Sequence, residues 1–260
     1  MPSWNSVLAA PAPRDHLVQL YTSELSLVRT VAEFVQHGLA DGDAVIAIAT
    51  GPHWTDVVAR LGLHGTEVGV AKARGQLIVL DAHDALRRLM VGGVPERAAM
   101  HSVVMPALQA ARAAGYSRIR AFGEMVDILN RRRNLAAAIR LEELWNDLLE
   151  TEQIALLCGY ALDPFDRAEY KETLPRIGDM HSHLMPVADA ERMEGAIDRA
   201  FIDVFGLHSD TSLLRDLCVG QLPTSTAMPK AQGALFALRD LDPRLADAVL
   251  ERAATYYRGA

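Results

Sequence analysis

Cysteine is scarce in this chain, which excludes a fold held together by disulfide bonds. Only Cys158 and Cys218 occur among the 260 residues, too few for the cross-linked framework of a small secreted domain. Cys158 falls within an apolar segment, so we expect a buried and unreactive thiol there. Because reduced thiols are typical of the cytoplasm, we expect a cytoplasmic protein.

Long hydrophobic runs and an excess of positive charge are also missing. No apolar run approaches the ~20 residues that a membrane span needs. The start of the chain lacks the basic and long apolar regions of a signal peptide. The formal net charge is −7, which argues against direct binding to DNA or RNA. We therefore expect neither a membrane nor a nucleic acid as a partner.

What the chain does contain is an alternation of apolar segments of strand length with amphipathic helices. The predicted strands cover residues 16–21, 43–50, 76–81, 117–122 and 153–160. The predicted helices between them include residues 54–61, 84–90, 96–114 and 134–151, and an apolar stripe at Leu27, Val31, Val35 and Leu39 marks another. This alternation predicts an α/β fold, with a mainly parallel sheet covered by helices on both faces.

The strand signal ends near Asp166, which suggests three parts. Residues 1–15, with three prolines, are expected to form a flexible leader, residues 16–165 an α/β domain, and residues 166–260 a helical C-terminal extension. Helices are predicted in the extension over residues 188–205, 213–219, 230–241 and 244–257. Apolar residues of the first, from Ala190 to Val204, would pack on the α/β domain or on a second copy of the chain, so a homodimer stays open.

A candidate ligand site follows the fourth predicted strand directly. Gly123 and Glu124 stand at its carboxyl end, where open α/β sheets bind ligands. We take Phe122, Gly123, Glu124 and Met125 as candidate ligand-binding residues, and expect Glu124 to pair with Tyr21, His16 or the ligand. The alternative is structural: Gly123 makes a tight turn and Glu124 caps the next helix.

The turn after the first strand argues against ATP hydrolysis. Strand, turn and helix follow the plan of a RecA-like nucleotide-binding domain, whose turn is a Gly-rich loop ending in Lys-Ser/Thr. Here the turn contains Tyr21, Thr22, Ser23 and Glu24, without glycine or lysine, and Glu24 adds negative charge where phosphates would bind. Ser23 can cap the helix, whose free amides can hold a small anion or polar ligand. These four residues are therefore further ligand-binding candidates.

Motifs for metal binding and covalent catalysis are weak. His181 and His183 are two residues apart at the start of a predicted helical region, where they would point to different faces. The other histidines show no ligand spacing, and no Gly-x-Ser-x-Gly elbow is present. We therefore expect no metal, no cofactor and no catalytic residue.

Several short motifs occur together and resemble one known family. They are His16 to Tyr21, Gly38 to Asp43, Gly123 to Met125, Leu141 to Trp145, and Leu157 to Tyr160. As a set they resemble the MEDS domain, a sensory domain named from methanogens, methylotrophs and a dichloromethane-responsive repressor, over roughly residues 16–165. The resemblance implies a RecA-like strand order without a phosphate loop, a ligand-sensing role, and His16, Tyr21 and Glu124 as pocket residues.

Family members are often joined to histidine kinase or DNA-binding segments, and this chain shows neither a kinase-type Gly-rich motif nor a basic recognition helix. We expect a non-catalytic sensor that binds an unknown small molecule and signals to a partner such as a kinase or a transcription regulator. Two alternatives stay open. One is a residual nucleotide-binding or hydrolytic enzyme that uses Glu124, and the other is an interaction scaffold that binds no ligand.

Overall fold

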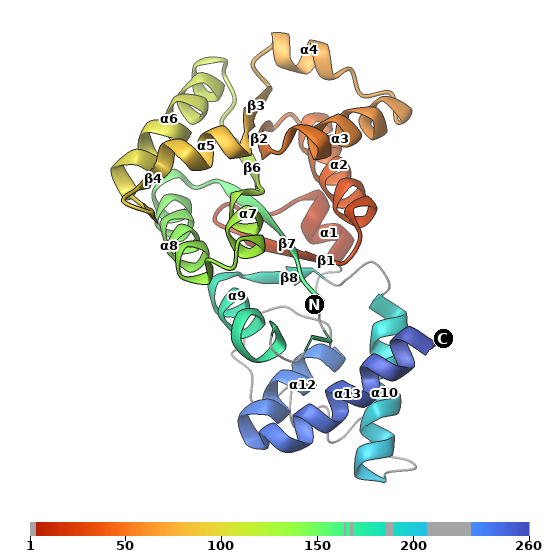
Figure 1. Ribbon diagram of the computed structural model, residues 1–260. Coiled ribbons are helices and arrows are strands. Elements are labelled where there is room, and N and C mark those ends of the chain that lie inside the picture. Colours follow the sequence, from red (N-terminus) through yellow and green to blue (C-terminus); the bar gives the residue numbers. More distant parts are fainter. Residues whose placement is uncertain (1–3, 164, 167–168, 186–189, 207–229, 260) are drawn as a thin grey trace. The chain divides into compact units, whose positions relative to one another are not determined.

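The computed structural model describes residues 4–163, 165–166, 169–185, 190–206 and 230–259. The chain divides into two compact units, Met1–Ala161 and Leu162–Ala260 (Figure 1). Among the described residues, no helix combines the length and the apolar character needed to cross a membrane.

A parallel sheet forms the centre of the first unit. Its strands are β1 (His16–Tyr21), β2 (Ala44–Ala49), β3 (Leu77–Asp81), β6 (Ile119–Gly123) and β7 (Ala155–Ala161). They lie in the order β3-β2-β6-β7-β1, and each neighbouring pair is parallel. Every residue of β1, β2 and β6 is buried, as expected for strands covered on both faces. The predicted mainly parallel α/β fold is confirmed.

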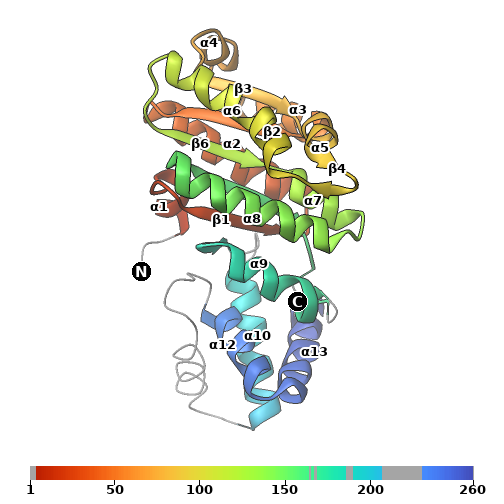
Figure 2. The ribbon, with the colours of Figure 1, turned by 90° about the vertical axis from the view of Figure 1, so that its left-hand side faces the viewer.

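Helices cover both faces of this sheet (Figures 1 and 2). One face carries α1 (Trp4–Ala9), α2 (Glu24–Ala40) and α3 (Gly51–Leu63), and the other carries α5 (Ala82–Leu89), α6 (Arg97–Ala113), α7 (Met125–Arg131) and α8 (Leu135–Glu152). The short α4 (Val68–Ala73) and the hairpin of β4 (Met90–Val91) and β5 (Val94–Pro95) were not expected from the sequence. Their brevity explains this, because six residues or fewer carry little periodic signal.

Side chains cap several of these helices, although not the one for which a cap was predicted. Asp81, Glu96 and Asn134 each accept a hydrogen bond from the backbone amide three residues later, at the starts of α5, α6 and α8. Ser23 holds the N-cap position of α2, but its side chain makes no capping bond. Instead the Ser26 hydroxyl donates to the Ser23 carbonyl at 2.7 Å.

The expected flexible leader contains structure. Val7 and Leu8 of α1 are buried, and Arg120 of β6 donates to the carbonyl of Ala9 at 3.0 Å. Pro11 and Pro13 follow this helix rather than interrupt it, so proline composition alone was misleading here.

The second unit is mainly helical. It contains a π-helical turn (Glu169–Thr173), α9 (Leu174–Met180), β8 (His183–Met185), α10 (Ala190–Phe205), α12 (Lys230–Leu241) and α13 (Pro243–Gly259). His183 therefore lies in a short strand rather than in the expected helical region. Met193, Ile197 and Phe201 of the apolar stripe are buried, and within this unit α10 packs against α12 and α13. Packing of this helix on the α/β domain or on a second copy stays a prediction. The helix predicted over residues 213–219 lies outside the described residues.

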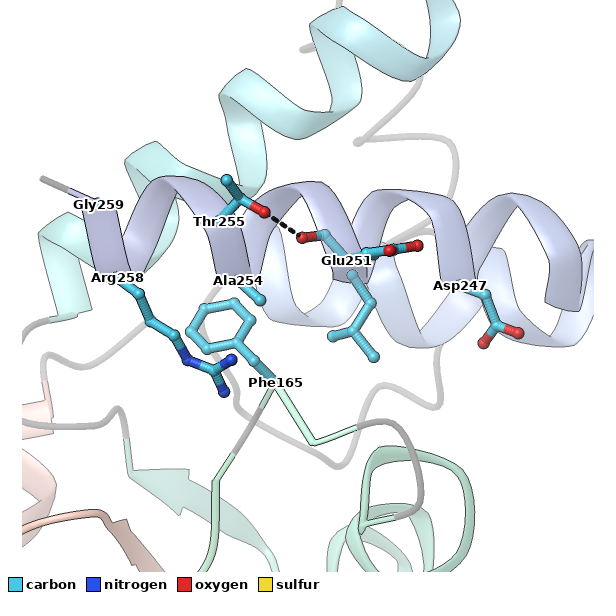
Figure 3. A pocket seen from close by; sticks show the side chains of 8 residues that line it. Phe165, Asp247, Glu251, Ala254, Thr255, Arg258 and Gly259 are labelled. Atoms are coloured by element: carbon cyan, nitrogen blue, oxygen red, sulfur yellow. Dashed lines mark hydrogen bonds between the residues drawn. The ribbon is translucent and has the colours of Figure 1, made fainter.

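A cavity of about 620 Å³ lies within this second unit, beside α13 (Figure 3). The ring of Phe165 packs against that of Tyr257, with centroids 5.0 Å apart. Arg258 lines the cavity and pairs with Asp163 at 2.6 Å. None of the residues proposed from the sequence as ligand-binding lines this cavity.

Candidate ligand site at the carboxyl edge of the sheet

The strand order creates a crevice between the ends of β2 and β6. After β2 the chain turns to α3 on one face of the sheet, whereas after β6 it turns to α7 and α8 on the other face. The two strands are neighbours, so their connections leave in opposite directions. Such a switch point is the usual ligand site of an open α/β sheet. Thr50 follows β2 and Glu124 follows β6, which places both at this point.

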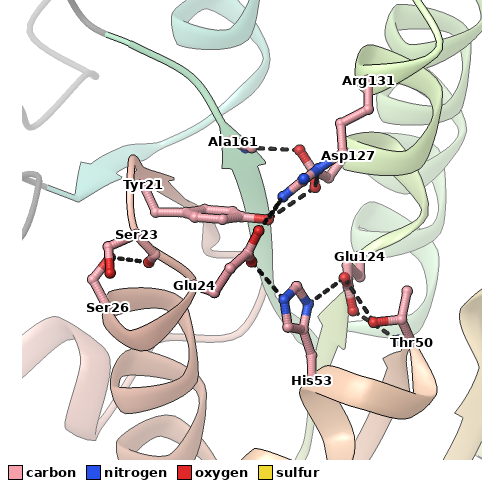
Figure 4. Close-up of polar contacts among 10 residues, drawn as sticks. All are labelled: Tyr21, Ser23, Glu24, Ser26, Thr50, His53, Glu124, Asp127, Arg131 and Ala161. Carbon is pink, nitrogen blue, oxygen red and sulfur yellow. Dashed lines mark hydrogen bonds and ion pairs between the residues drawn. The ribbon is translucent and has the colours of Figure 1, made fainter.

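Glu124 is buried and reaches across the crevice (Figure 4). It is only 2% exposed. Its carboxylate accepts hydrogen bonds from the Thr50 amide at 2.7 Å and from the Thr50 hydroxyl at 3.1 Å. Glu124 holds the N-cap position of α7, but its side chain makes no capping bond. The structural alternative, in which this carboxylate caps the next helix, is therefore not realised.

His53, in the first turn of α3, lies between two carboxylates. Its Nδ1 atom is 2.5 Å from Glu124, and its Nε2 atom is 2.5 Å from Glu24 at the start of α2. A histidine that donates from both ring nitrogens is the charged imidazolium. The hydrogen bond to Glu124 raises the pKa of His53, against the opposing effect of burial. The imidazolium therefore joins the starts of two helices to the end of β6.

Arg131 of α7 continues this network on the other side of Glu24. It donates to Glu24 at 2.9 Å, to the buried Asp127 at 2.7 Å and to the Tyr21 hydroxyl at 2.8 Å. Asp127 also accepts from the Tyr21 hydroxyl at 2.9 Å and from the Ala161 amide at 2.7 Å. The ends of β1, β2, β6 and β7 are thus tied together by one polar network.

The network sets the charge states of its members. Burial opposes ionisation of Glu24, but the hydrogen bond from Arg131 and the charge of His53 outweigh it and lower the pKa of Glu24. Burial, together with the neighbouring Asp127 carboxylate, raises the pKa of the Tyr21 hydroxyl. Glu24 is therefore held as a carboxylate between the cations His53 and Arg131.

A cavity of about 380 Å³ opens beside this network. Six of its lining residues belong to the network, namely Glu24, Thr50, His53, Glu124, Asp127 and Arg131. The other lining residues are Pro52, His83, Ile128 and Arg132. The volume is at the small end of the range typical of ligand pockets.

Apart from His16, the ligand-binding residues predicted from the sequence divide into three groups. Glu24 and Glu124 line the cavity, and Tyr21 is joined to the network through its hydroxyl. Thr22 and Ser23 are exposed and do not line it. Phe122, Gly123 and Met125 are buried in the core behind it.

His16 lies elsewhere, and the expected partners of Glu124 are not those found. His16 begins β1 and Tyr21 ends it, so the two are separated by the length of the strand, about 17 Å at ~3.3 Å per residue. His16 contacts Asn146, Cys158 and Glu142 instead. Glu124 pairs with Thr50 and His53 rather than with Tyr21 or His16.

Several site residues were not found by sequence reasoning. Thr50 is the last residue of the second predicted strand and His53 lies just beyond it, as Glu124 lies just beyond the fourth, so the same strand-end argument applies to them. Asp127 and Arg131 are four residues apart on one helix, a spacing that favours an ion pair. Both signals were present in the sequence.

Comparison with known proteins identifies the family of this chain. Among curated proteins no match is found. One family model, described as the methanogen/methylotroph, DcmR sensory domain, matches residues 15–174. That range contains every strand of the parallel sheet and every member of the polar network. This chain therefore belongs to the MEDS family of sensory domains.

Proposed function

We propose that this protein is a cytoplasmic, non-catalytic sensor that binds a small molecule in the cavity beside Glu124 and His53. The sensory family supports a role in signal transduction. One observation carries the proposal of a ligand: a buried carboxylate, an imidazolium and a guanidinium line a cavity at the switch point of the sheet.

The lining residues favour a small ligand with one hydrogen-bond acceptor and a short apolar part. Pro52 and Ile128 supply apolar contact, and His53 and Arg131 supply N–H donors. Both donors are now engaged by Glu24. A carboxylate, carbonyl or hydroxyl oxygen of the ligand would compete with Glu24 for them.

Glu24 is well suited to move aside. Its side chain is 54% exposed, so water can solvate it when the ligand takes its place. Glu24 stands in the first turn of α2, and its release would alter the start of that helix. We propose that this change is the signal, passed to a partner such as a kinase or a transcription regulator.

The same residue argues against a nucleotide. Glu24 places a carboxylate at the start of α2, where a RecA-like ATPase would hold phosphates. The Glu24 carboxylate would repel phosphates bound there, and no lysine is present in the turn to offset its negative charge.

The test is native mass spectrometry of the purified full chain, followed by a thermal-shift screen of small carboxylic acids, ketones and alcohols. Ligand binding should raise the apparent stability by about 2.7 kcal/mol at a hundredfold excess over Kd. Glu124→Gln should weaken binding by roughly 1–3 kcal/mol, because a buried charged partner of His53 is lost.

The matched control is Glu150→Gln. Glu150 is 67% exposed and pairs with Arg14 outside the cavity, so this variant should bind like the unaltered protein. Equal binding by Glu124→Gln and Glu150→Gln would place the ligand elsewhere. Absence of any bound molecule or thermal shift would favour the interaction scaffold.

A further inference from the structure

A second buried polar cluster lies in the first unit, away from the cavity residues. It contains His16 of β1, Glu142 of α8 and Cys158 of β7, none more than 2% exposed. We infer that these three side chains form a binding site for a divalent transition-metal ion, with zinc as the best match.

The separations of the three donor atoms fit a single metal ion. His16 Nε2 lies 3.3 Å from Glu142 Oε2 and 3.5 Å from Cys158 Sγ, and that sulfur lies 3.8 Å from Glu142 Oε2. Zinc bonds of about 2.0–2.3 Å at tetrahedral angles place such atoms roughly 3.3–3.6 Å apart. The observed distances agree with this range to about 0.3 Å, so a small adjustment of the side chains would seat the ion.

The fold brings these donors together from three elements. In the parallel pairing of β1 with β7, His16 lies beside Leu156, and Cys158 is two residues further along β7. Because side chains alternate along a strand, His16 and Cys158 point to the same face of the sheet. Glu142 reaches them from α8, which covers that face (Figure 2).

Two further residues orient the proposed ligands. The Nδ1 atom of His16 lies 2.8 Å from the Asn146 side-chain oxygen, so Nδ1 donates to that oxygen and Nε2 is the nitrogen that would bind the metal ion. Asn146 is one helical turn after Glu142, so both project from the same face of α8. The Tyr160 hydroxyl donates to the other oxygen of Glu142 at 2.7 Å. Metal ligands in proteins typically have such outer partners.

The charge of the set also suits a divalent ion. A buried carboxylate is costly unless its charge is compensated. One thiolate, one carboxylate and one neutral imidazole carry a total charge of −2, which would balance a charge of +2. Soft sulfur together with nitrogen and oxygen favours zinc or its neighbours over magnesium or calcium, which take oxygen ligands. A fourth ligand would complete the tetrahedron.

The competing explanation is a hydrogen-bonded core without metal. In the metal-free protein, burial and the Glu142 carboxylate raise the pKa of the Cys158 thiol, and that thiol can donate to Glu142 at 3.8 Å. Metal content and thiolate spectroscopy separate the two explanations, because only a metal ion turns the thiol into a coordinated thiolate.

The experiment uses the full chain, equilibrated with zinc, freed of excess metal and measured for metal by mass spectrometry. We expect about one zinc per chain. With cobalt in place of zinc, a thiolate-to-cobalt charge-transfer band should appear, and Cys158→Ser should abolish it. Cys218→Ser, which removes the chain's other cysteine, should retain it.

Glu142→Gln tests the proposal independently if Cys158→Ser fails to fold, because glutamine keeps the shape of the glutamate side chain. It should keep the charge-transfer band and lower zinc affinity at least tenfold. Less than a tenth of an equivalent of zinc in the unaltered protein, together with no cobalt–thiolate band, would overturn the proposal. A band that survives Cys158→Ser and vanishes in Cys218→Ser would overturn it as well.

Discussion

His53 Nδ1 lies 2.5 Å from the buried carboxylate of Glu124, and this contact links the segments that follow two neighbouring strands. The carboxylate is fixed from its other side by the Thr50 amide and hydroxyl. Glu124 therefore has little freedom, whereas His53 keeps one ring nitrogen directed at the half-exposed Glu24. The His53 imidazolium thus has one fixed partner, Glu124, and one that a ligand can replace, Glu24. For this reason the contact between His53 and Glu124 is the centre of the proposed sensor.

The first prediction is a pH-dependent contribution of His53 to stability. Its pKa is raised on folding, first by the hydrogen bond to Glu124. The stabilisation is therefore complete below about pH 6.5, the ordinary pKa of histidine, and is lost as the pH rises through the raised folded value. The difference in free energy of unfolding between the unaltered protein and His53→Gln should therefore be largest near pH 6 and should decrease as the pH rises.

Urea unfolding between about pH 6 and 9 measures this difference, and an NMR titration of the His53 ring gives its pKa directly. The control is His64→Gln, because His64 is exposed at the end of the same helix. Its stability difference from the unaltered protein should stay near zero. A folded His53 pKa at or below 6.5 would contradict the assignment of an imidazolium.

A second prediction concerns ATP. The turn between β1 and α2 contains no lysine, and the Glu24 carboxylate stands at the start of α2. Purified full-length protein should release no phosphate from ATP with Mg²⁺ above the rate without protein. Steady release that Glu124→Gln abolishes would establish the RecA-like enzyme and overturn the non-catalytic sensor.

The strands could be predicted from the sequence because each is a nearly continuous apolar run. The segment from His16 to Tyr21 was predicted at the same bounds as those of β1. The order of the strands in the sheet could not be predicted in this way, because apolar periodicity does not show which strands are neighbours. The crevice was nevertheless expected, since Glu124 follows a strand, and carboxyl ends of parallel strands share one edge.

The partners of Glu124 could not be predicted in the same way. His53 is separated from it by many residues, and only the pairing of β2 with β6 brings them together. His16 was placed in the pocket on resemblance, although it stands at the opposite end of β1 from Tyr21. The contact of His16 with Glu142 depends on helix packing, which a strand pattern does not specify.

A third prediction is that the Tyr21 hydroxyl stabilises the first unit. It donates to Asp127 and accepts from Arg131, and the ring is 1% exposed. Tyr21→Phe should lower the free energy of unfolding by about 1.5–3 kcal/mol, the usual worth of hydrogen bonds to charged groups. Tyr116→Phe, at a partly exposed position, should change it by less than about 0.5 kcal/mol. Equal effects of the two variants would show that the network contributes little to stability.

The last prediction contrasts two glycines that both lie within helices. Replacing glycine by alanine in a helix normally stabilises a protein by about 0.5–1 kcal/mol. At Gly62 of α3 an added Cβ atom meets nothing within 4 Å, so Gly62→Ala should show this gain. At Gly38 of α2 the Cβ atom would lie 2.7 Å from Cδ of Arg120 and 2.9 Å from Val45.

Arg120 cannot easily give way at Gly38. It is 1% exposed and bound to the buried Asp43, with its Nε 2.9 Å from the carboxylate. Moving it would weaken a buried ion pair, which is costly. Gly38→Ala should therefore destabilise the protein by about 1–3 kcal/mol, the usual cost of overpacking. Urea unfolding of both variants tests the difference in sign, and a stabilised Gly38→Ala would mean that Arg120 is free to rearrange.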